Sequence, residues 1–402
     1  MEENKQNIFC YRIAQIVSGV VTRFIFKRKI IRNEIKGKNG PFVVIANHQA
    51  AFDFVNLIGI TRTPLTFVIS NSFYNSLPIK GFMRKLGVIP KQQFQTSVKD
   101  MKKMRAVIDA SKPLVIYPAG LMCEDGLSTP IPAATYKFLK WLDADVYVAK
   151  TSGTYFSMPK WAKGLRPGET HLDVYKLFDR QKLAEMNIAE IKMRTDEAIL
   201  FDAYREQEKL LVKYKNNDNI EGLQNVLYQC PHCKAEFSVQ VKRKNTIYCT
   251  ECGFEQVSDE YAFLHNNSGI GDELRYVSDW SRFIYNDLKQ KIQCGLCDTL
   301  SAATKIHMID YKNQKFAQVG EGGITLTEKR FLIDGRINGQ TVSLSIPIAN
   351  FASLPFSPGK HLEIQHGGDI YRCVLEDGRL VMKFINMVKI FYELNLSARE
   401  KV

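Results

Sequence analysis

Short apolar runs alternate with amphipathic stretches between residues 42 and 151. The apolar runs have the length of strands and are rich in β-branched residues, and the stretches between them repeat with the period of a helix. Strand-like runs occupy 42–46, 65–69, 113–117 and 145–149, and helix-like runs occupy 100–110 and 133–142. Strands that alternate with helices are typical of a sheet covered by helices. We therefore predict an α/β domain, a mixed sheet with flanking helices, over 41–212.

A second pattern precedes this domain, because residues 8–31 repeat with helical period and separate apolar from polar positions. The apolar face holds Phe9, Ile13, Ile16, Val17, Val20 and Phe24. Four cations follow closely, at Lys27, Arg28, Lys29 and Arg32. A helix of this kind fits the interface of an anionic membrane, and the alternative is a helix packed on the domain's own sheet. We assign residues 1–40 to this segment.

The second half of the chain changes character after a helical region at 178–214 and a polar stretch at 213–219, where we place a domain boundary. From 302 to 376 apolar and polar residues alternate between Gly and Asn turns, which predicts strands. A helix with one apolar face follows from Leu380 to Leu394. Strands closed by one C-terminal helix resemble a pleckstrin-homology (PH) or GRAM-type barrel. We therefore predict a β-rich domain over 261–402.

Composition limits the class of protein. A chain of 402 residues with 45% hydrophobic residues should form two or three globular domains. The apolar stretch near the N-terminus is interrupted by Arg12 and Arg23, so it is too short to span a bilayer. Glu2 and Glu3 argue against a signal peptide. The net charge of +13 suits an anionic membrane or phosphate-bearing substrates.

Two cysteine pairs have the spacing of a metal site. Cys230 and Cys233, then Cys249 and Cys252, form a Cys-x2-Cys-x15-Cys-x2-Cys pattern. This spacing is typical of a zinc ribbon, in which four thiolates hold a structural zinc ion and a β-hairpin joins the two knuckles. We place the ribbon at 220–260. A third pair, Cys294 and Cys297, has no partner pair, and we interpret it as ordinary turn cysteines.

The segment that follows the run at 42–46 carries candidate chemistry. Asn47 and His48 form a polar turn after this strand, and Asp53 follows in the first turn of a predicted helix. A carboxylate that accepts a proton from one imidazole nitrogen leaves the other nitrogen free to accept one. The alternative is an aspartate that starts a helix and a histidine that bonds to local backbone.

This Asn-His-x4-Asp segment resembles the first motif of the glycerolipid acyltransferase family, whose bacterial members include 1-acylglycerol-3-phosphate acyltransferase. Three further segments resemble the later motifs in the same order. They are Gly87-Val88-Ile89-Pro90-Lys91, then Leu114 to Gly120 in place of the usual F-P-E-G, and Val146 to Ala149. The resemblance implies the glycerolipid acyltransferase-like fold for this part of the chain.

The resemblance also implies an activity, the transfer of a fatty acyl group from a thioester to the hydroxyl of a lysophospholipid in phospholipid biosynthesis or remodelling. The donor would be acyl-CoA or acyl carrier protein. His48 would be the general base and Asp53 its orienting carboxylate. Helix-start amides near Asn47 would stabilise the oxyanion. The residues implied to lie at the substrate are Asn47, Gly87, Lys91, Pro118 and Gly120.

The third motif departs from the family. Ala119 replaces its glutamate, and Leu121-Met122 replace the Thr-Arg that usually follows. We therefore expect a different lysophospholipid or a glycolipid as an alternative acceptor to lysophosphatidate, and Glu124 is a candidate replacement for the missing carboxylate.

A different class of function is a lipid- or nucleic-acid-binding regulator with weak or no catalysis. In the ribbon, four cations are opposed by five acidic residues between 230 and 260, so we do not expect nucleic acid to bind there. We expect an enzyme at the cytoplasmic face of a membrane, attached peripherally.

Overall fold

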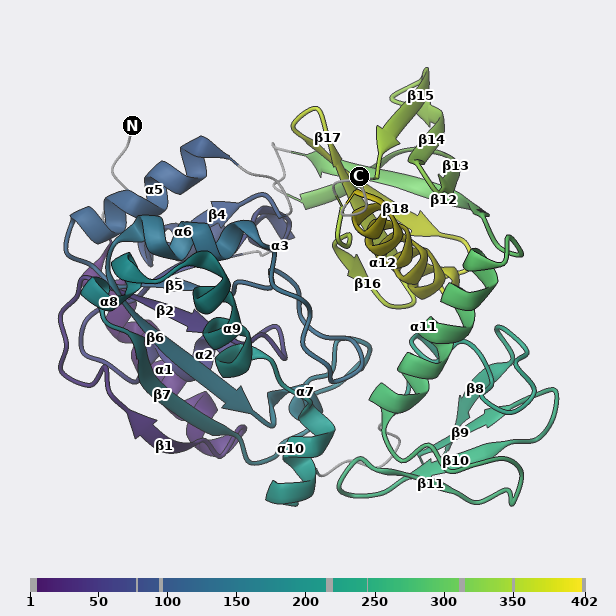
Figure 1. Cartoon of the computed structure of the whole chain (residues 1–402), viewed down its shortest axis with the longest axis horizontal. Coiled ribbons are helices and arrows are strands. Elements are labelled where there is room, and N and C mark those ends of the chain that lie inside the picture. The colour runs from purple at the N-terminus through teal and green to yellow at the C-terminus, as the bar shows by residue number, and fades with distance from the viewer. Residues whose placement is uncertain are drawn as a thin grey trace. The chain divides into compact units, whose positions relative to one another are not determined.

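The computed structural model describes residues 6–76, 79–93, 97–214, 220–243, 245–310, 315–348 and 351–399. Residues 215–219 of the expected boundary and Lys244 of the ribbon lie outside this description. The chain divides into two compact units (Figure 1). The first unit comprises Met1–Lys160 with Leu165–Lys215, and the second comprises Trp161–Gly164 with Asn216–Val402. We describe each unit separately.

A seven-stranded sheet forms the centre of the first unit, in the order β1-β7-β6-β2-β5-β3-β4. Only the β6–β7 pair is antiparallel among the pairs in this sheet. The sheet is therefore mixed, as the sequence predicted. Its strands are β1 (Lys29–Asn33), β2 (Phe42–Ala46), β3 (Thr66–Ser70), β4 (Ile89–Lys91), β5 (Leu114–Ile116), β6 (Asp145–Ser152) and β7 (His171–Phe178).

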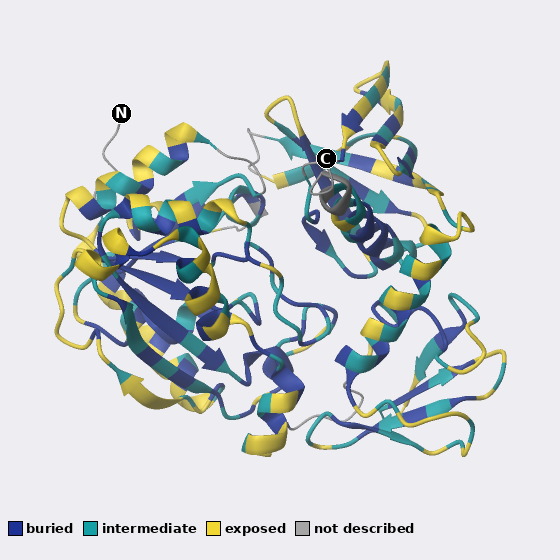
Figure 2. Ribbon diagram, in the orientation of Figure 1, coloured by how far each residue is buried: buried dark blue, intermediate teal, exposed yellow. Residues whose placement is uncertain are grey.

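Helices cover both faces of this sheet, and β2 shows why. Val43 and Ile45 point into one apolar layer, and Phe42, Val44 and Ala46 point into the other, because successive strand side chains alternate between faces. Figure 2 shows the central strands of the sheet in the buried colour, whereas the edge strand β1 is exposed. The helices are α1 (Ile8–Phe24), α2 (Asp53–Ile58), α3 (Asn71–Ser76), α4 (Lys80–Lys85), α5 (Val98–Asp109), α6 (Ala134–Leu142), α7 (Thr154–Ser157), α8 (Arg180–Glu185), α9 (Ile188–Ile199) and α10 (Ala203–Leu210).

The N-terminal helix is shorter than predicted, and it packs on the domain through its small and polar residues. It ends at Phe24, and residues 29–33 form β1 at the edge of the sheet. Its buried side consists of Tyr11, Ala14, Ser18 and Thr22. The Ser18 hydroxyl donates to the Val55 carbonyl at 2.6 Å, and the Tyr11 hydroxyl accepts from the Leu65 amide at 2.9 Å. The apolar face faces away from the domain, so α1 is held by its small and polar side.

The second unit begins with a four-stranded antiparallel sheet in the order β11-β10-β9-β8. The hairpin of β8 and β9 joins the two cysteine pairs, as a ribbon requires. A 3-10 turn (Leu223–Asn225) precedes this sheet, and the long helix α11 follows it. The elements are β8 (Val239–Lys242), β9 (Thr246–Cys249), β10 (Glu255–Ser258), β11 (Leu264–Asn266) and α11 (Val277–Gln293).

A seven-stranded antiparallel sheet follows, in the order β15-β14-β13-β12-β18-β17-β16. One C-terminal helix, α12, closes it, which confirms the predicted β-rich end. Gly322 lies opposite Gly335, and a Cβ at Gly322 would stand 2.2 Å from the Asp334 carbonyl oxygen, so glycine is required where β13 and β14 approach. The elements are β12 (Thr299–Asp310), β13 (Lys315–Thr327), β14 (Arg330–Ile337), β15 (Gln340–Pro347), β16 (Phe356–Ser357), β17 (His361–His366), β18 (Asp369–Leu375) and α12 (Leu380–Arg399).

Polar contacts join the ribbon to the helices of the same unit. Glu236 accepts from Lys383 of α12 at 2.6 Å and lies 3.5 Å from Lys291 of α11. The side chain of Gln229 donates to Asp287 of α11, and the backbone carbonyl of Gln229 accepts from the indole N–H of Trp280. The ribbon therefore packs as part of the second unit.

We expect Glu236→Gln to loosen this junction. The Lys383 side chain is only 14% exposed, and removing the partner of a largely buried charge destabilises by about 1 to 3 kcal/mol. Hydrogen exchange of α12 amides should therefore be faster. Glu251→Gln, at an exposed ribbon position, is the control and should leave exchange unchanged. Equal exchange in Glu236→Gln and wild type would refute this role.

Candidate functional site

The carboxyl ends of four parallel strands bring the predicted motifs to one edge of the sheet. β2 lies between β5 and β6, with all five residues buried, and His48 follows two residues after its end. β5 leads into Tyr117, and β4 ends at Lys91. The rings of His48 and Tyr117 have centroids 4.5 Å apart, and Gln93 donates to the carbonyl of Gly120. The first three motifs therefore meet where open α/β sheets hold their ligands.

His48 and Asp53 form a hydrogen-bonded pair. Nδ1 of His48 lies 2.9 Å from Oδ2 of Asp53. The same oxygen accepts from the amides of Gln49 at 2.6 Å and Ala50 at 2.9 Å. Asp53 is 1% exposed and the His48 side chain is 20% exposed. A carboxylate with only donors around it takes the Nδ1 proton as a third bond, so Nε2 is left as the proton acceptor.

Asp53 thus does what both sequence interpretations expected. It is the first residue of α2 and satisfies two amides of the preceding turn, and it also orients the imidazole. These bonds correct one expectation, because the amides of Gln49 and Ala50 are used by Asp53 and are not free for an oxyanion.

Two neighbouring amide side chains fix the turn to β6 and α7. Asn47 is buried, and its Oδ1 and Nδ2 bond to the amide and the carbonyl of Thr151, each at 2.8 Å. Gln49 accepts from the Thr154 hydroxyl and the Tyr155 amide. Asn47 was predicted at the substrate, and the structure shows its side chain holding the turn against the neighbouring strand.

Tyr117 is a site residue that the sequence reasoning missed. Its ring is tilted by 36° to the imidazole. Its hydroxyl is buried and has no hydrogen-bond partner among the described residues. Burial, and then the nearby charge of Asp53, raise the pKa of Tyr117 well above its usual value, so the hydroxyl stays protonated. The sequence did contain a signal for it, because tyrosine stands here in place of the phenylalanine of the resembling motif.

The other predicted site residues have different surroundings. Gly87 has φ +75° just after α4, and a Cβ there would meet the Gln6 side chain at 3.1 Å, so it ends a helix. The Lys91 ammonium donates to the Gln92 carbonyl, and burial lowers its pKa.

Pro118 is buried. At Gly120, with φ +71°, a Cβ would meet nothing within 4 Å, so this position has open space. Glu124 is buried.

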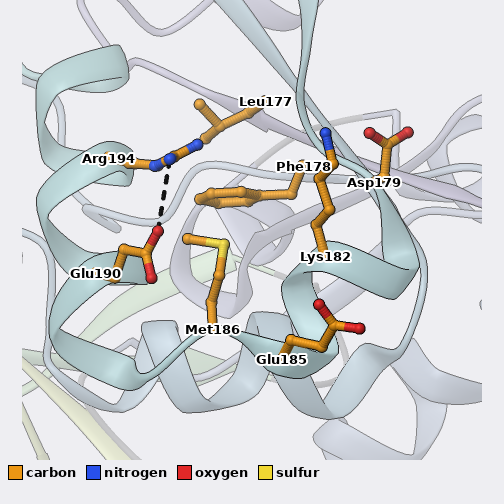
Figure 3. Close-up of a pocket in the computed structure, with 8 residues that line it drawn as sticks. All are labelled: Leu177, Phe178, Asp179, Lys182, Glu185, Met186, Glu190 and Arg194. Atoms are coloured by element: carbon orange, nitrogen blue, oxygen red, sulfur yellow. Dashed lines mark ion pairs between the residues drawn. The ribbon is translucent and has the colours of Figure 1, made fainter.

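A surface pocket of about 340 Å³ lies elsewhere on the first unit (Figure 3). Phe178 and Met186 line it together with an ion pair between Arg194 and Glu190, at 3.5 Å. Phe178 pairs with Val146 near the start of β6, whereas His48 follows the ends of the parallel strands. The pocket therefore lies near the amino end of β6, away from the carboxyl ends of the strands, and does not belong to the His48 site.

The four predicted ligand cysteines form a cluster that could hold a metal ion. Their sulfur atoms all lie within 4.8 Å of one another. The sulfurs of Cys230 and Cys252 are 3.6 Å apart, and those of Cys233 and Cys249 are 3.7 Å apart. Four thiolates about 2.3 Å from one tetrahedral ion would stand about 3.8 Å apart. The cluster therefore fits such an ion.

No described helix combines the length and the hydropathy needed to cross a bilayer. Residues 27–149 match a family model described as Acyltransferase. No curated protein matches the chain.

Two solved structures are similar to parts of the chain. One is the 1-acyl-sn-glycerophosphate (LPA) acyltransferase PlsC from Thermotoga maritima, at 16% identity and a TM-score of 0.42, covering 50% of this chain and 79% of that chain. The other is the Ran binding domain of Nup2 from Ashbya gossypii, at 12% identity and a TM-score of 0.20, covering 25% of this chain and 99% of that chain.

Proposed function

We propose that this chain, whose residues 27–149 match the Acyltransferase family model, transfers a fatty acyl group from an acyl thioester to the hydroxyl of a lysophospholipid or related glycerolipid. The observation that carries the proposal is the 2.9 Å bond between His48 and a buried Asp53, at the edge where three motifs meet. The donor would be acyl-CoA or acyl carrier protein.

In this mechanism His48 acts as the general base. Nε2 removes the proton of the acceptor hydroxyl while its oxygen attacks the thioester carbonyl. Asp53 holds Nδ1–H and stabilises the imidazolium that forms. The tetrahedral intermediate collapses, the carbon–sulfur bond breaks, and the thiolate takes the proton from His48. The products are an ester and a free thiol.

The residues of the third motif bear on the head group of the acceptor. Ala119 and Leu121, where the family has glutamate and threonine, are both buried, and neither can bind a polar head group. Lys91 at the end of β4 is the nearest match to the family's basic residue. We therefore propose a lysophospholipid or related glycerolipid acceptor, to be identified with a panel of lysolipids read by mass spectrometry.

We expect His48→Ala to abolish turnover. Loss of a general base costs on the order of 10² to 10⁴ in rate, and Asp53→Asn should also be severe because an amide can favour the wrong tautomer. The assay is acyl transfer from a labelled donor. His366→Ala, an exposed histidine at the end of β17, is the control. Wild-type turnover by His48→Ala that is folded by circular dichroism would exclude this mechanism.

For the cysteine cluster we propose one structural zinc ion per chain, held by Cys230, Cys233, Cys249 and Cys252. Four protein thiolates complete a tetrahedral shell, so the ion would stabilise the ribbon and take no part in acyl transfer.

Elemental analysis should find one zinc per chain in the wild type. Cys230→Ser should lose the metal and lower the melting temperature. Cys294→Ser, in the third cysteine pair, is the matched control and should keep the metal. Absence of metal from freshly prepared reduced protein would disprove the assignment.

We further propose that the enzyme attaches peripherally to the cytoplasmic face of a membrane through α1. Phe9, Ile16 and Phe24 are 74%, 69% and 67% exposed, although they belong to the apolar face of the helix. Ile30 and Ile31 of β1 are exposed beside them in sequence. All nine cysteines are unpaired, which supports a reducing compartment.

The cations after α1 support attachment less than their number suggests. Arg28 donates to the Asn56 carbonyl at 2.5 Å, and burial lowers its pKa. Lys29 pairs with Glu169 at 2.8 Å, and Arg32 binds Asp173 through two bonds. Their charges are partly compensated inside the unit, so the apolar face should dominate the binding energy.

We expect the triple variant Phe9→Gln, Ile16→Gln and Phe24→Gln to lose binding to vesicles of phosphatidylcholine and phosphatidylglycerol. Each side chain contributes about 1 kcal/mol at partial depth, so affinity should fall on the order of 100-fold. The fold should survive because the buried side of α1 is unchanged. High salt should weaken wild-type binding without abolishing it.

The control is the pair Met193→Gln and Leu296→Gln, which changes exposed apolar residues elsewhere and should leave flotation with vesicles unchanged. Undiminished flotation of the triple variant would show that α1 is not the attachment site.

A further inference from the structure

The two oxygens of Asp53 have unequal surroundings. Oδ2 accepts from His48, Gln49 and Ala50. Oδ1 is buried and has no hydrogen-bond partner among the described residues. A buried carboxylate oxygen without a donor is costly, so a donor close to Oδ1 would change the energy of the whole pair.

Tyr117 provides a donor of the right kind. Its ring packs on the imidazole at 4.5 Å, and its hydroxyl is the complementary orphan, a buried donor without an acceptor in the described part of the chain. Burial, and then the charge of Asp53, raise the pKa of this hydroxyl, so it stays protonated. Hydrogen bonds of active sites are often long in the free enzyme and tighten when substrate binds.

We infer that Tyr117 is a positioning residue for the His48–Asp53 pair, whose hydroxyl donates to Oδ1 of Asp53 in the substrate complex and whose ring holds the imidazole. This inference rests on the proposed function for the roles of His48 and Asp53. With Oδ1 bound, the carboxylate plane is fixed and Oδ2 stays on Nδ1. With one face of the imidazole covered, Nε2 keeps its direction. The hydroxyl is a feature of this chain, because the resembling motif has phenylalanine.

Asn56 is the competing donor. It lies three residues after Asp53 on α2, on the same side of the helix, and both polar atoms of its buried side chain are unpaired among the described residues. Tyr117 is favoured because it also contacts His48 and is acted on by the Asp53 charge.

The test compares Tyr117→Phe, which removes only the hydroxyl, with Tyr117→Leu, which also removes the ring. In ¹⁵N-labelled full-length protein, the nitrogen shifts of His48 report its tautomer and the Cε1 proton reports the ring current of Tyr117. We expect Tyr117→Phe to mix the two tautomers in the presence of lysophosphatidylcholine, a lysophospholipid that cannot be acylated while no donor is present. We expect Tyr117→Leu also to move the Cε1 proton downfield.

The kcat should fall about tenfold in Tyr117→Phe, the value of one bond to a charged group, and KM should stay within about twofold.

Tyr136→Phe is the matched control. Its hydroxyl donates to Asp196 at 2.6 Å on α9, so this variant removes a tyrosine–aspartate bond away from His48 and should leave the His48 spectrum and kcat unchanged. An unchanged His48 spectrum in Tyr117→Phe would overturn the inference. The same changes in Asn56→Leu but not in Tyr117→Phe would overturn it in favour of Asn56. The spectrum reports on positioning even if no acyl transfer is found, so the two proposals fail separately.

Discussion

Three donors converge on one oxygen of Asp53, and the arrangement of the site depends on this convergence. The imidazole, the turn after β2 and the first turn of α2 are all fixed by the same atom. The convergence in turn depends on β2, which is buried on both faces and cannot shift without disturbing two apolar layers. Asn47 adds a second constraint, because it binds the end of the neighbouring strand. A short, local hydrogen-bond pattern is thus held by the most buried part of the domain.

The sequence predicted the features that are local in the chain. His48 and Asp53 are five residues apart, and each cysteine pair spans four residues. The cysteine spacing predicted the ribbon, and the order of four short motifs gave the His48–Asp53 pair its expected role. It did not predict which face of α1 would be buried, because this depends on Val55 and Leu65, far away in sequence. Tyr117 was missed for a similar reason, since its contact with His48 exists only when β2 and β5 pair. The helix predicted at 178–214 is three helices, with Asn187 and Asp202 capping the second and third.

The ribbon is better understood as part of its unit than as a separate binding module. Gln229 and Glu236 connect it to α11 and α12, and Glu236 pairs with Lys291 and Lys383, two cations that a phosphate would otherwise attract. Its near-neutral charge agrees with this interpretation. Metal binding energy in such modules is folding energy, and these contacts would pass part of it to the helices of the second unit.

The order of strands in the first sheet has a consequence for synthesis of the chain. β2 pairs with residues 114–116 and 145–149, and β1 pairs with residues 171–174. Non-local pairing of this kind forms slowly. During translation, the apolar run 42–46 therefore has no strand partner until residue 114 has been made, and its second neighbour begins only at residue 145. His48 and Asp53 are close neighbours in sequence, yet the sheet that supports their turn is completed only late. Until its partner strands are made, the apolar run 42–46 is exposed in the nascent chain and is prone to aggregate.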